Sequence, residues 1–328
     1  MKLLNQLGWR HYASKQPASI GKARLGRVRR VDRGEVDALT EEGELRVASD
    51  SQRTTIDLAP ATGDWITVVD DPDIGFHIET ILPRYSSISR RDPAEQEKEQ
   101  VLVSNVDFVG ITCSVDRPPN IAKIERFLIL AQDSDAVPLL LLTKVDQGIS
   151  EGWNQLQKEI RDVITIQTSS VTGTGISQVR ELLSPDKTLV LLGESGVGKS
   201  TLVNELVGEA IQQTTEVRSR DNKGRHTTIA RELMLLPSGG ILIDTPGIRG
   251  IGLWDAKEAL NKVFFEISEV ASYCRFSNCT HQVEPDCAIL AAIQEKEIDP
   301  QRFERYLRLV EELDEQEERL ILQRRKSK

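Results

Sequence analysis

The strongest chemical signal in the chain is a glycine-rich octapeptide in its second half. It reads Gly193-Glu194-Ser195-Gly196-Val197-Gly198-Lys199-Ser200 and fits the pattern G-x-x-x-x-G-K-[ST]. Glycines let the backbone N–H groups face a phosphate, Lys199 would reach the β- and γ-phosphates, and the Ser200 hydroxyl would hold Mg²⁺. The apolar run from Thr188 to Leu192 precedes it, and a helix is expected to begin near Thr201, which completes the phosphate-binding set. The alternative is a glycine-rich turn without a ligand.

A second motif with an acidic residue follows downstream. Ile243-Asp244-Thr245-Pro246-Gly247 places a carboxylate at the end of an apolar run and a glycine three residues later. The Asp244 carboxylate can bind Mg²⁺ through a bridging water, and the Gly247 N–H can donate a hydrogen bond to the γ-phosphate. Between the two motifs, residues 221–228 are polar and lack apolar periodicity, which is typical of a nucleotide-dependent switch. We expect Thr227 or Thr228 to close onto Mg²⁺ when the γ-phosphate is present.

Two further motifs concern the base of a nucleotide. In Thr143-Lys144-Val145-Asp146, the Asp146 carboxylate can accept two hydrogens that guanine offers and adenine does not, while the Lys144 stem packs on the ring. A loop with Ser169 and Ser170 follows another apolar run and fits the segment whose backbone meets the guanine carbonyl. T-K-x-D alone is a common surface tetrapeptide, so coincidence is the alternative. The pairing with the second loop favours GTP.

The order of these motifs differs from that of ordinary small GTPases, in which the phosphate loop comes first. Here both base motifs precede the phosphate loop. A circular permutation preserves the sheet and the site while it moves the chain ends. The segment after Asp244 therefore leads directly into the C-terminal part, and nucleotide state could move that part as a lever.

Three cysteines and a histidine cluster near the C-terminus as Cys274-x4-Cys279-x-His281-x5-Cys287. Three sulfurs and one nitrogen form a complete tetrahedral set for one zinc ion and leave no position for a substrate water, which indicates a structural ion. Three clustered cysteines cannot all pair with one another, and no export signal is evident, so a metal is favoured over disulfides. Cys113 lies on an expected core strand, where it acts as a small apolar residue.

Composition and charge narrow the class of protein. The 328 residues carry a formal charge of −9, and the apolar runs are far too short to span a bilayer, so we expect a cytoplasmic, monomeric protein without a membrane partner. The charge is uneven, because residues 1–33 hold nine Lys or Arg residues and one acid, Asp32. A local concentration of positive charge favours the binding of a polyanion such as a nucleic acid. The alternative is a solvated, disordered basic terminus. The candidate phosphate contacts are Arg24, Arg27, Arg29, Arg30 and Arg33.

The elements that must position these residues change in type along the chain. Short β segments from about residue 20 to 85 predict a small barrel, and the polar stretch from Ser86 to Gln100 predicts a linker. Apolar strands then alternate with helical patterns, which predicts a mostly parallel sheet with helices on both faces. We expect three domains: residues 1–85 with an N-terminal arm and the barrel, 86–255 with the nucleotide motifs, and 256–328 with the zinc site among helices.

This set of motifs resembles the ribosome small subunit-dependent GTPase A (RsgA) family of circularly permuted GTPases, and the resemblance extends over nearly the whole chain. Besides the permuted nucleotide motifs and the Cys-x4-Cys-x-His-x5-Cys run, the segments that carry it are Gly63-Asp64-Trp65, Pro83-Arg84, Asn105-Val106-Asp107 and the switch segment Gly224-Arg225-His226-Thr227-Thr228. The resemblance implies an N-terminal OB-fold that binds nucleic acid, a central α/β P-loop GTPase domain and a C-terminal helical zinc-binding domain. It also implies GTP hydrolysis in late maturation of the small (30S) ribosomal subunit, with rRNA contact and stimulation by that subunit.

Two positions depart from the wider GTPase pattern. Thr143 stands where the base motif most often has Asn, so we expect one polar contact to guanine to be shorter or lost. Ile248 follows Gly247 where many GTPases carry the Gln that orients the attacking water, and an aliphatic side chain cannot do so. We therefore hypothesise that His226 positions the water and acts with Lys199, Thr227 and Thr228 in catalysis. The alternative is that His226 has only a structural role in the switch.

Other functions fit parts of the pattern. A P-loop ATPase or kinase would share Lys199 and Ser200, and selection of ATP over GTP would contradict the role given to Asp146. An RNA-binding scaffold with a degenerate nucleotide site would show no turnover even with ribosomal subunits present.

Trp65 could stack on a base, although a tryptophan that enters a small barrel is more often part of the core.

Overall fold

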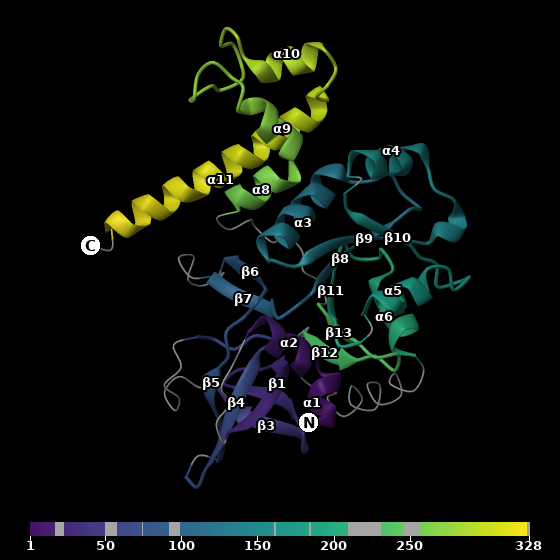
Figure 1. Ribbon diagram of the computed structural model, residues 1–328, viewed down its shortest axis with the longest axis vertical. Helices are drawn as coiled ribbons and strands as arrows, with labels where there is room; N and C mark the ends of the chain where they lie inside the picture. The colour runs from purple at the N-terminus through teal and green to yellow at the C-terminus, as the bar shows by residue number, and fades with distance from the viewer. Residues whose placement is uncertain are drawn as a thin grey trace.

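The computed structural model describes residues 1–16, 23–49, 58–73, 75–91, 99–160, 162–183, 185–208, 231–245 and 256–326. Along the chain, two short helices and a barrel are followed by a six-stranded sheet with flanking helices, and then by a group of helices (Figure 1). Within these ranges, no helix combines the length and the apolar character needed to cross a membrane.

The barrel is built from five strands that close in the order β1-β2-β3-β5-β4, the order of an OB-fold. The strands are β1 (Arg24–Val31), β2 (Glu35–Thr40), β3 (Gly43–Ala48), β4 (Trp65–Asp71) and β5 (Gly75–Ile81). Successive side chains of a strand point to opposite faces, so alternate residues such as Val36 and Ala38 fill the barrel interior. The predicted barrel is confirmed.

The N-terminal residues form helices, where the sequence indicated only a basic arm. α1 (Lys2–Gln6) and α2 (Trp9–Lys15) bury apolar side chains against the barrel and the sheet. The ring of Trp9 packs edge-on against Trp65, with 5.0 Å between ring centroids. Trp65 is fully buried, so its interpretation as a core residue is confirmed.

The expected linker from Ser86 to Gln100 is wrong in its described parts. β6 (Ser87–Arg91) and β7 (Glu99–Ser104) pair antiparallel as a two-stranded sheet. Ile88 of this polar segment is buried in the main core opposite Val103, which follows the segment in β7, and this burial stabilises the strand pair.

The central sheet has the order β10-β9-β8-β11-β13-β12, and each neighbouring pair is parallel except β12 with β13. Its strands are β8 (Phe108–Ser114), β9 (Val137–Thr143), β10 (Ile164–Gln167), β11 (Thr188–Leu192), β12 (Glu232–Leu235) and β13 (Ile241–Asp244). Because β8, β9 and β10 come earlier in the chain than the central β11, the sheet has the permuted connectivity that the motif order predicted. The mostly parallel sheet is confirmed.

Helices cover both faces of this sheet (Figure 1). They are α3 (Ile121–Asp133), the 3-10 helix η1 (Val145–Gln147), α4 (Glu151–Glu159), α5 (Ile176–Leu183) and α6 (Lys199–Val207). The residues of β11 alternate between two cores: Leu189 and Leu191 pack with α5 and α6, whereas Val190 and Leu192 pack with α3 and α4. Asn120 caps the N-terminus of α3, and its side chain accepts a hydrogen bond from the Lys123 N–H at 3.2 Å.

A buried polar cluster, here named the barrel joint, fixes the barrel to the sheet. Its members are Arg27, Gly63, Asp64, Arg84, Ser104, Asn105 and Thr188. The Arg27 guanidinium donates to the carbonyl oxygens of Leu7 (2.5 Å), Gly63 (3.2 Å) and Asn105 (2.9 Å). It also donates to the Thr188 hydroxyl at 3.0 Å. Gly63 has a φ of +99°, and a Cβ there would lie 2.2 Å from the Ser104 carbonyl oxygen, so only glycine fits.

The C-terminal helices dock on α3 through a second cluster, here named the helix joint. These helices are α8 (Lys257–Val263), α9 (Phe265–Ala271), α10 (Ala288–Gln294) and α11 (Pro300–Lys326). The joint consists of Glu125 and Arg126 on α3 with Arg302, Arg305 and Glu312 on α11. Glu125 is 0% exposed and accepts hydrogen bonds from Arg302 (3.0 Å) and Arg305 (2.8 Å).

Candidate nucleotide site and metal centre

The phosphate-loop residues lie between β11 and α6, at the carboxyl edge of the sheet, as the sequence predicted. Gly193 has a φ of +147°, and a Cβ there would lie 2.4 Å from the Thr112 carbonyl oxygen, which explains the need for glycine at the start of the loop. The Lys199 ammonium donates to the carbonyl oxygens of Gly193 (2.7 Å) and Glu194 (2.6 Å). The lysine therefore folds back across the loop, while Ser200 and Thr201 are exposed in the first turn of α6.

Thr143 joins the first base motif to the phosphate loop. It ends β9, and its hydroxyl donates to the Val197 carbonyl oxygen at 2.5 Å across more than fifty residues of sequence. A Cβ on Gly198 would lie 3.3 Å from the same hydroxyl oxygen. The short threonine side chain, noted above as a departure from the common Asn, thus holds two motifs of the expected site together.

Lys144 extends along the edge of the phosphate loop. Its ammonium donates to the Asp116 carboxylate at 2.6 Å and lies 3.5 Å from the Gly196 carbonyl oxygen. Asp116 also accepts a hydrogen bond from Ser114, and the bonds from Lys144 and Ser114 lower the pKa of its carboxyl group to about 2. Asp116 was not among the residues expected at the site. It lies just beyond the end of β8, where the carboxyl ends of parallel strands place functional residues, but it belongs to none of the motifs.

The two base loops meet at Asp146 and Ser169. The Ser169 hydroxyl donates to one Asp146 carboxylate oxygen at 2.5 Å, and the Val145 N–H donates to the Thr168 carbonyl oxygen at 3.3 Å. Ser169 is buried and Ser170 is half-buried. Residues from the ends of β9 and β10 are thereby brought beside the loop that follows β11, although they lie far apart in sequence.

Asp244 ends β13, which pairs in parallel with β11. Burial raises the pKa of the Asp244 carboxyl group, and the positive charge of Lys199 opposes this change. Its neighbour Thr245 donates through its hydroxyl to the Leu191 carbonyl oxygen at 2.6 Å. The half-buried Asp244 carboxylate and the Ser200 hydroxyl offer the hard oxygen ligands that Mg²⁺ prefers, so the residues present fit that ion.

The remaining expected site residues, His226, Thr227, Thr228 and Gly247, lie outside the described residues. Their roles stay predictions.

The four expected zinc ligands converge. One ligand atom from each of Cys274, Cys279, His281 and Cys287 lies within 4.8 Å of the other three. The sulfurs of Cys274 and Cys287 are 3.9 Å apart, and His281 Nδ1 is 3.4 Å from each of them. A tetrahedral zinc ion with its usual bond lengths requires separations of about 3.8 Å between sulfurs and about 3.6 Å between sulfur and nitrogen. The donor set therefore fits zinc in both chemistry and size.

The arginines suggested as phosphate contacts are largely engaged within the protein. Arg27 is 1% exposed in the barrel joint, so its expected contact with nucleic acid is wrong. Arg24 pairs with Glu42 at 3.0 Å, Arg30 pairs with Asp32 at 2.9 Å, and Arg29 pairs with both Glu44 and Glu232. Acids later in the sequence therefore pair with Arg24 and Arg29, and Asp32 pairs with Arg30.

Two family models match the chain. The RsgA GTPase model matches residues 81–254, and a model described as 50S ribosome-binding GTPase matches residues 188–321. A relative from Streptomyces avermitilis, the "Small ribosomal subunit biogenesis GTPase RsgA", is 41% identical over 300 residues, which cover 88% of this chain and 79% of the relative.

Solved structures are similar as well. YjeQ from Thermotoga maritima aligns with a TM-score of 0.62 and 26% identity over 88% of this chain and 98% of that chain. YloQ, described as a circularly permuted GTPase, aligns with a TM-score of 0.61 and 22% identity over 92% of this chain and 98% of that chain, and it supports the fold.

Proposed function

The chain belongs to the RsgA GTPase family and is a GTP hydrolase, and from this premise we propose that it acts in late maturation of the small ribosomal subunit. The proposal includes stimulation of its GTPase activity by that subunit, contact with the subunit's rRNA, a monomeric state and a cytoplasmic location. The names of the relatives, which are small ribosomal subunit biogenesis GTPases, support the choice of subunit.

The observation that carries the nucleotide assignment is the hydrogen bond between Thr143 and the Val197 carbonyl oxygen, because it brings a base motif against the phosphate loop. In the proposed complex, guanine lies against the Lys144 stem and pairs with the Asp146 carboxylate. Ser169 orients that carboxylate through its 2.5 Å hydrogen bond, and the neighbouring Ser170 belongs to the loop that meets the guanine carbonyl.

The phosphates occupy the loop from Gly193 to Thr201 in this proposal. Lys199 exchanges its bonds to two loop carbonyl oxygens for the β- and γ-phosphates, and its charge stabilises the negative charge that develops during transfer. Ser200 and Asp244 would hold Mg²⁺, which the family implies and which supplies further charge neutralisation. Gly247, Thr227 and Thr228 would close around the γ-phosphate, and His226 would position the attacking water.

A structural zinc ion is the corresponding proposal for the C-terminal cluster. Three cysteines and one histidine saturate a tetrahedral ion and leave no open position for chemistry. Metal analysis of the purified protein should give one zinc per chain and a loss of that zinc in Cys279→Ser. Retention of a full equivalent in the variant would contradict the assignment.

GTP turnover measured with and without purified small ribosomal subunits tests the proposed function. We expect the subunits to raise the turnover of the wild-type protein and Lys199→Ala to abolish it, because the phosphate contacts are lost. Equal turnover in both conditions would contradict stimulation by the subunit. No turnover in either condition would favour the RNA-binding scaffold.

Base selection can be tested separately. Asp146→Asn replaces an acceptor by an amide that donates, which suits xanthine better than guanine. We expect this variant to lose GTP binding and to gain XTP binding, as measured by fluorescence competition. A variant that binds GTP as the wild-type protein does, or a wild-type protein that prefers ATP, would contradict the base assignment.

A further inference from the structure

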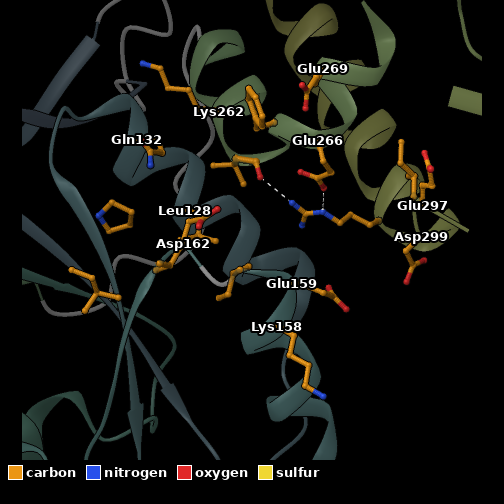
Figure 2. A pocket seen from close by; sticks show the side chains of 18 of the residues that line it. Leu128, Gln132, Lys158, Glu159, Asp162, Lys262, Glu266, Glu269, Glu297 and Asp299 are labelled. Carbon is orange, nitrogen blue, oxygen red and sulfur yellow. Dashed lines mark hydrogen bonds and ion pairs between the residues drawn. The ribbon is translucent and has the colours of Figure 1, made fainter. Parts of the chain in front are cut away.

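A groove of about 1430 Å³ lies between the central sheet and the C-terminal helices. One wall is formed by the end of α3, the beginnings of β9 and β10 and the end of α4, and the other by α8 to α10 and the beginning of α11 (Figure 2). All strands of a parallel sheet have their amino ends on one side of the sheet and their carboxyl ends on the opposite side. The groove is therefore at the opposite edge from Thr143 and the nucleotide site.

The groove has an exposed apolar surface. Val137, Ile164 and Phe265 line it and are 46%, 47% and 64% exposed. Val137 and Ile164 begin the adjacent strands β9 and β10, and Phe265 begins α9 on the opposite wall. Large apolar side chains gathered in a concave surface mark an interaction site more often than isolated ones do.

The rim of the groove is acidic. Seven of its lining residues are Asp or Glu and four are Lys or Arg. In Figure 2, Glu159 at the end of α4 and Asp162 just before β10 lie on the first wall, while Glu266, Glu269, Glu297 and Asp299 lie on the wall formed by the C-terminal helices. Arg302 and Glu266 neutralise each other within the wall, because the Arg302 guanidinium bonds to Glu266 as well as to Glu125 and the Val263 carbonyl oxygen, so the rim charge comes from the other acids. Lys262 pairs with Glu258 at 2.8 Å.

These properties limit the occupant. The volume exceeds that of small-molecule sites, which are on the order of 300–1,000 Å³. An acidic rim repels the phosphates of RNA and attracts lysine and arginine side chains. The apolar residues between the acids can hold an apolar side chain of the same segment.

We propose that this groove binds an extended segment of a partner protein that carries lysine or arginine residues around an apolar anchor. The positive side chains contact the acids on both walls, and the anchor packs against Val137, Ile164 and Phe265. The identity of the partner rests on the proposed function. The segment then belongs to a protein of the small ribosomal subunit, because proteins packed against rRNA carry basic segments.

The basic C-terminus of this chain does not reach the groove of the same molecule. α11 begins at the groove with Pro300 and continues for 27 residues to Lys326, which corresponds to about 40 Å at 1.5 Å per residue. In Figure 1 the C-terminus lies at the far end of this helix. The C-terminus of a second copy is an alternative occupant that experiments can distinguish.

A binding assay with the full-length protein tests the acidic rim. The probe is a fluorescein-labelled peptide of lysines around a central Leu-Leu pair, followed by fluorescence anisotropy. Asp162→Lys with Glu269→Lys reverses one exposed acid on each wall, and Asp70→Lys with Glu181→Lys makes the same change of charge at exposed sites outside the groove. We expect the groove variant to bind about tenfold more weakly and the control to change less than about twofold. Equal losses in both variants, or no binding by the wild-type protein, would overturn the proposal.

The apolar anchor is tested with Phe265→Ser, which changes an exposed side chain and leaves the core intact. We expect this variant to bind the leucine-containing peptide about fivefold more weakly and to bind an all-lysine peptide as the wild-type protein does. An identical affinity of variant and wild-type protein for the leucine-containing peptide would overturn the role of the anchor.

A photo-crosslinking residue in place of Phe265, used with purified small ribosomal subunits, identifies the occupant. A crosslink to a basic segment of a subunit protein would support the proposal, and a crosslink to rRNA or to a second copy would overturn it. Co-sedimentation with the subunits reports on the proposed function separately. If the protein does not sediment with them, that function fails, whereas the peptide assays still decide the role of the groove.

Discussion

The two joints attach neighbouring parts of the protein to the central sheet and to its helix α3 by different chemistry. The barrel joint contains the ion pair of Asp64 with Arg84, but its link to Asn105 and Thr188 is the buried Arg27 guanidinium, which is met by backbone carbonyl oxygens and a hydroxyl. In the helix joint, the buried Glu125 carboxylate is met by two guanidinium groups. A buried charge that loses its ionic partner is strongly destabilising, whereas neutral hydrogen bonds distribute the loss over several groups. Glu125 is therefore the fully buried charge of the helix joint, which the Arg126–Glu312 pair and the packing of Ile129 supplement.

The joints also differ in their position relative to the nucleotide site. The barrel joint contacts Asn105 and Thr188, which lie at the amino ends of β8 and β11, away from the phosphate loop. The helix joint is on α3, whose first turn contacts the phosphate loop through Lys123 and Glu194 at 2.6 Å. A change of conformation at the phosphate loop can therefore act on α3, and so on the C-terminal helices, through a direct contact. In the part of the chain that the structure describes, the Arg27 hydrogen bonds of the barrel joint include no such direct contact with the phosphate loop.

The largest expected effect is that of Glu125→Ala. The substitution leaves the guanidinium groups of Arg302 and Arg305 without their shared buried carboxylate, and we expect a loss of about 3–5 kcal/mol in the free energy of unfolding. Urea denaturation measures this loss. Glu312→Ala is the matched control, because its pair with Arg126 is only partly buried. Similar losses for both variants would remove the distinction between a buried anchor and an ordinary ion pair.

Arg27→Met should break the barrel joint with a smaller effect. The methionine fills much of the space but leaves the carbonyl oxygens of Leu7, Gly63 and Asn105 without their donor, and we expect a loss of about 3 kcal/mol. Thermal unfolding of this variant and of Arg24→Met, which removes a half-exposed pair with Glu42, provides the comparison. An unchanged stability of Arg27→Met would show that the guanidinium does not fix the barrel.

Alkaline pH should lower the free energy of unfolding through a tyrosine that packs beside the barrel, Tyr12. Burial, with a contribution from Asp64, raises the pKa of Tyr12 to about 12, and its hydroxyl donates to the Pro83 carbonyl oxygen at 2.8 Å. Because the folded state holds this proton more tightly, the contribution is complete below pH 10 and is lost as the pH rises towards 12. We expect a loss on the order of 2 kcal/mol over that interval. Urea denaturation at several pH values measures it, and Tyr12→Phe should remove this part of the pH dependence.

The smallest effect is expected for Lys123→Met. Its pair with Glu194 is 36% and 38% exposed, so its contribution to stability should be below about 1 kcal/mol. The measurement is urea denaturation alongside Glu125→Ala. A loss as large as that of Glu125→Ala would show that the contact with the phosphate loop, and not the buried carboxylate, anchors α3.

The linear motifs were readable from the sequence because their spacing is set by local backbone geometry. A phosphate loop needs its glycines, lysine and serine within one turn between a strand and a helix, and the zinc ligands likewise lie close together in the chain. Alternating apolar runs also predicted the barrel strands and the mostly parallel sheet. The segment from Ser86 to Gln100 was misread, because its local polarity outweighed the single large apolar residue Ile88, which becomes buried when β6 pairs with β7.

What the sequence determined by itself was the set of chemical groups and the permuted order in which they occur. What only the tertiary structure decided was which groups lie together over long separations. Asp116 meets Lys144, Glu125 meets Arg302 and Arg305, and the acids of the groove come from segments on either side of the phosphate loop. Such pairings depend on how helices and strands pack, and no local spacing encodes them. For the same reason, the positive charge of the first residues looked available for nucleic acid until folding placed Arg27 in the core and acids beside its neighbours.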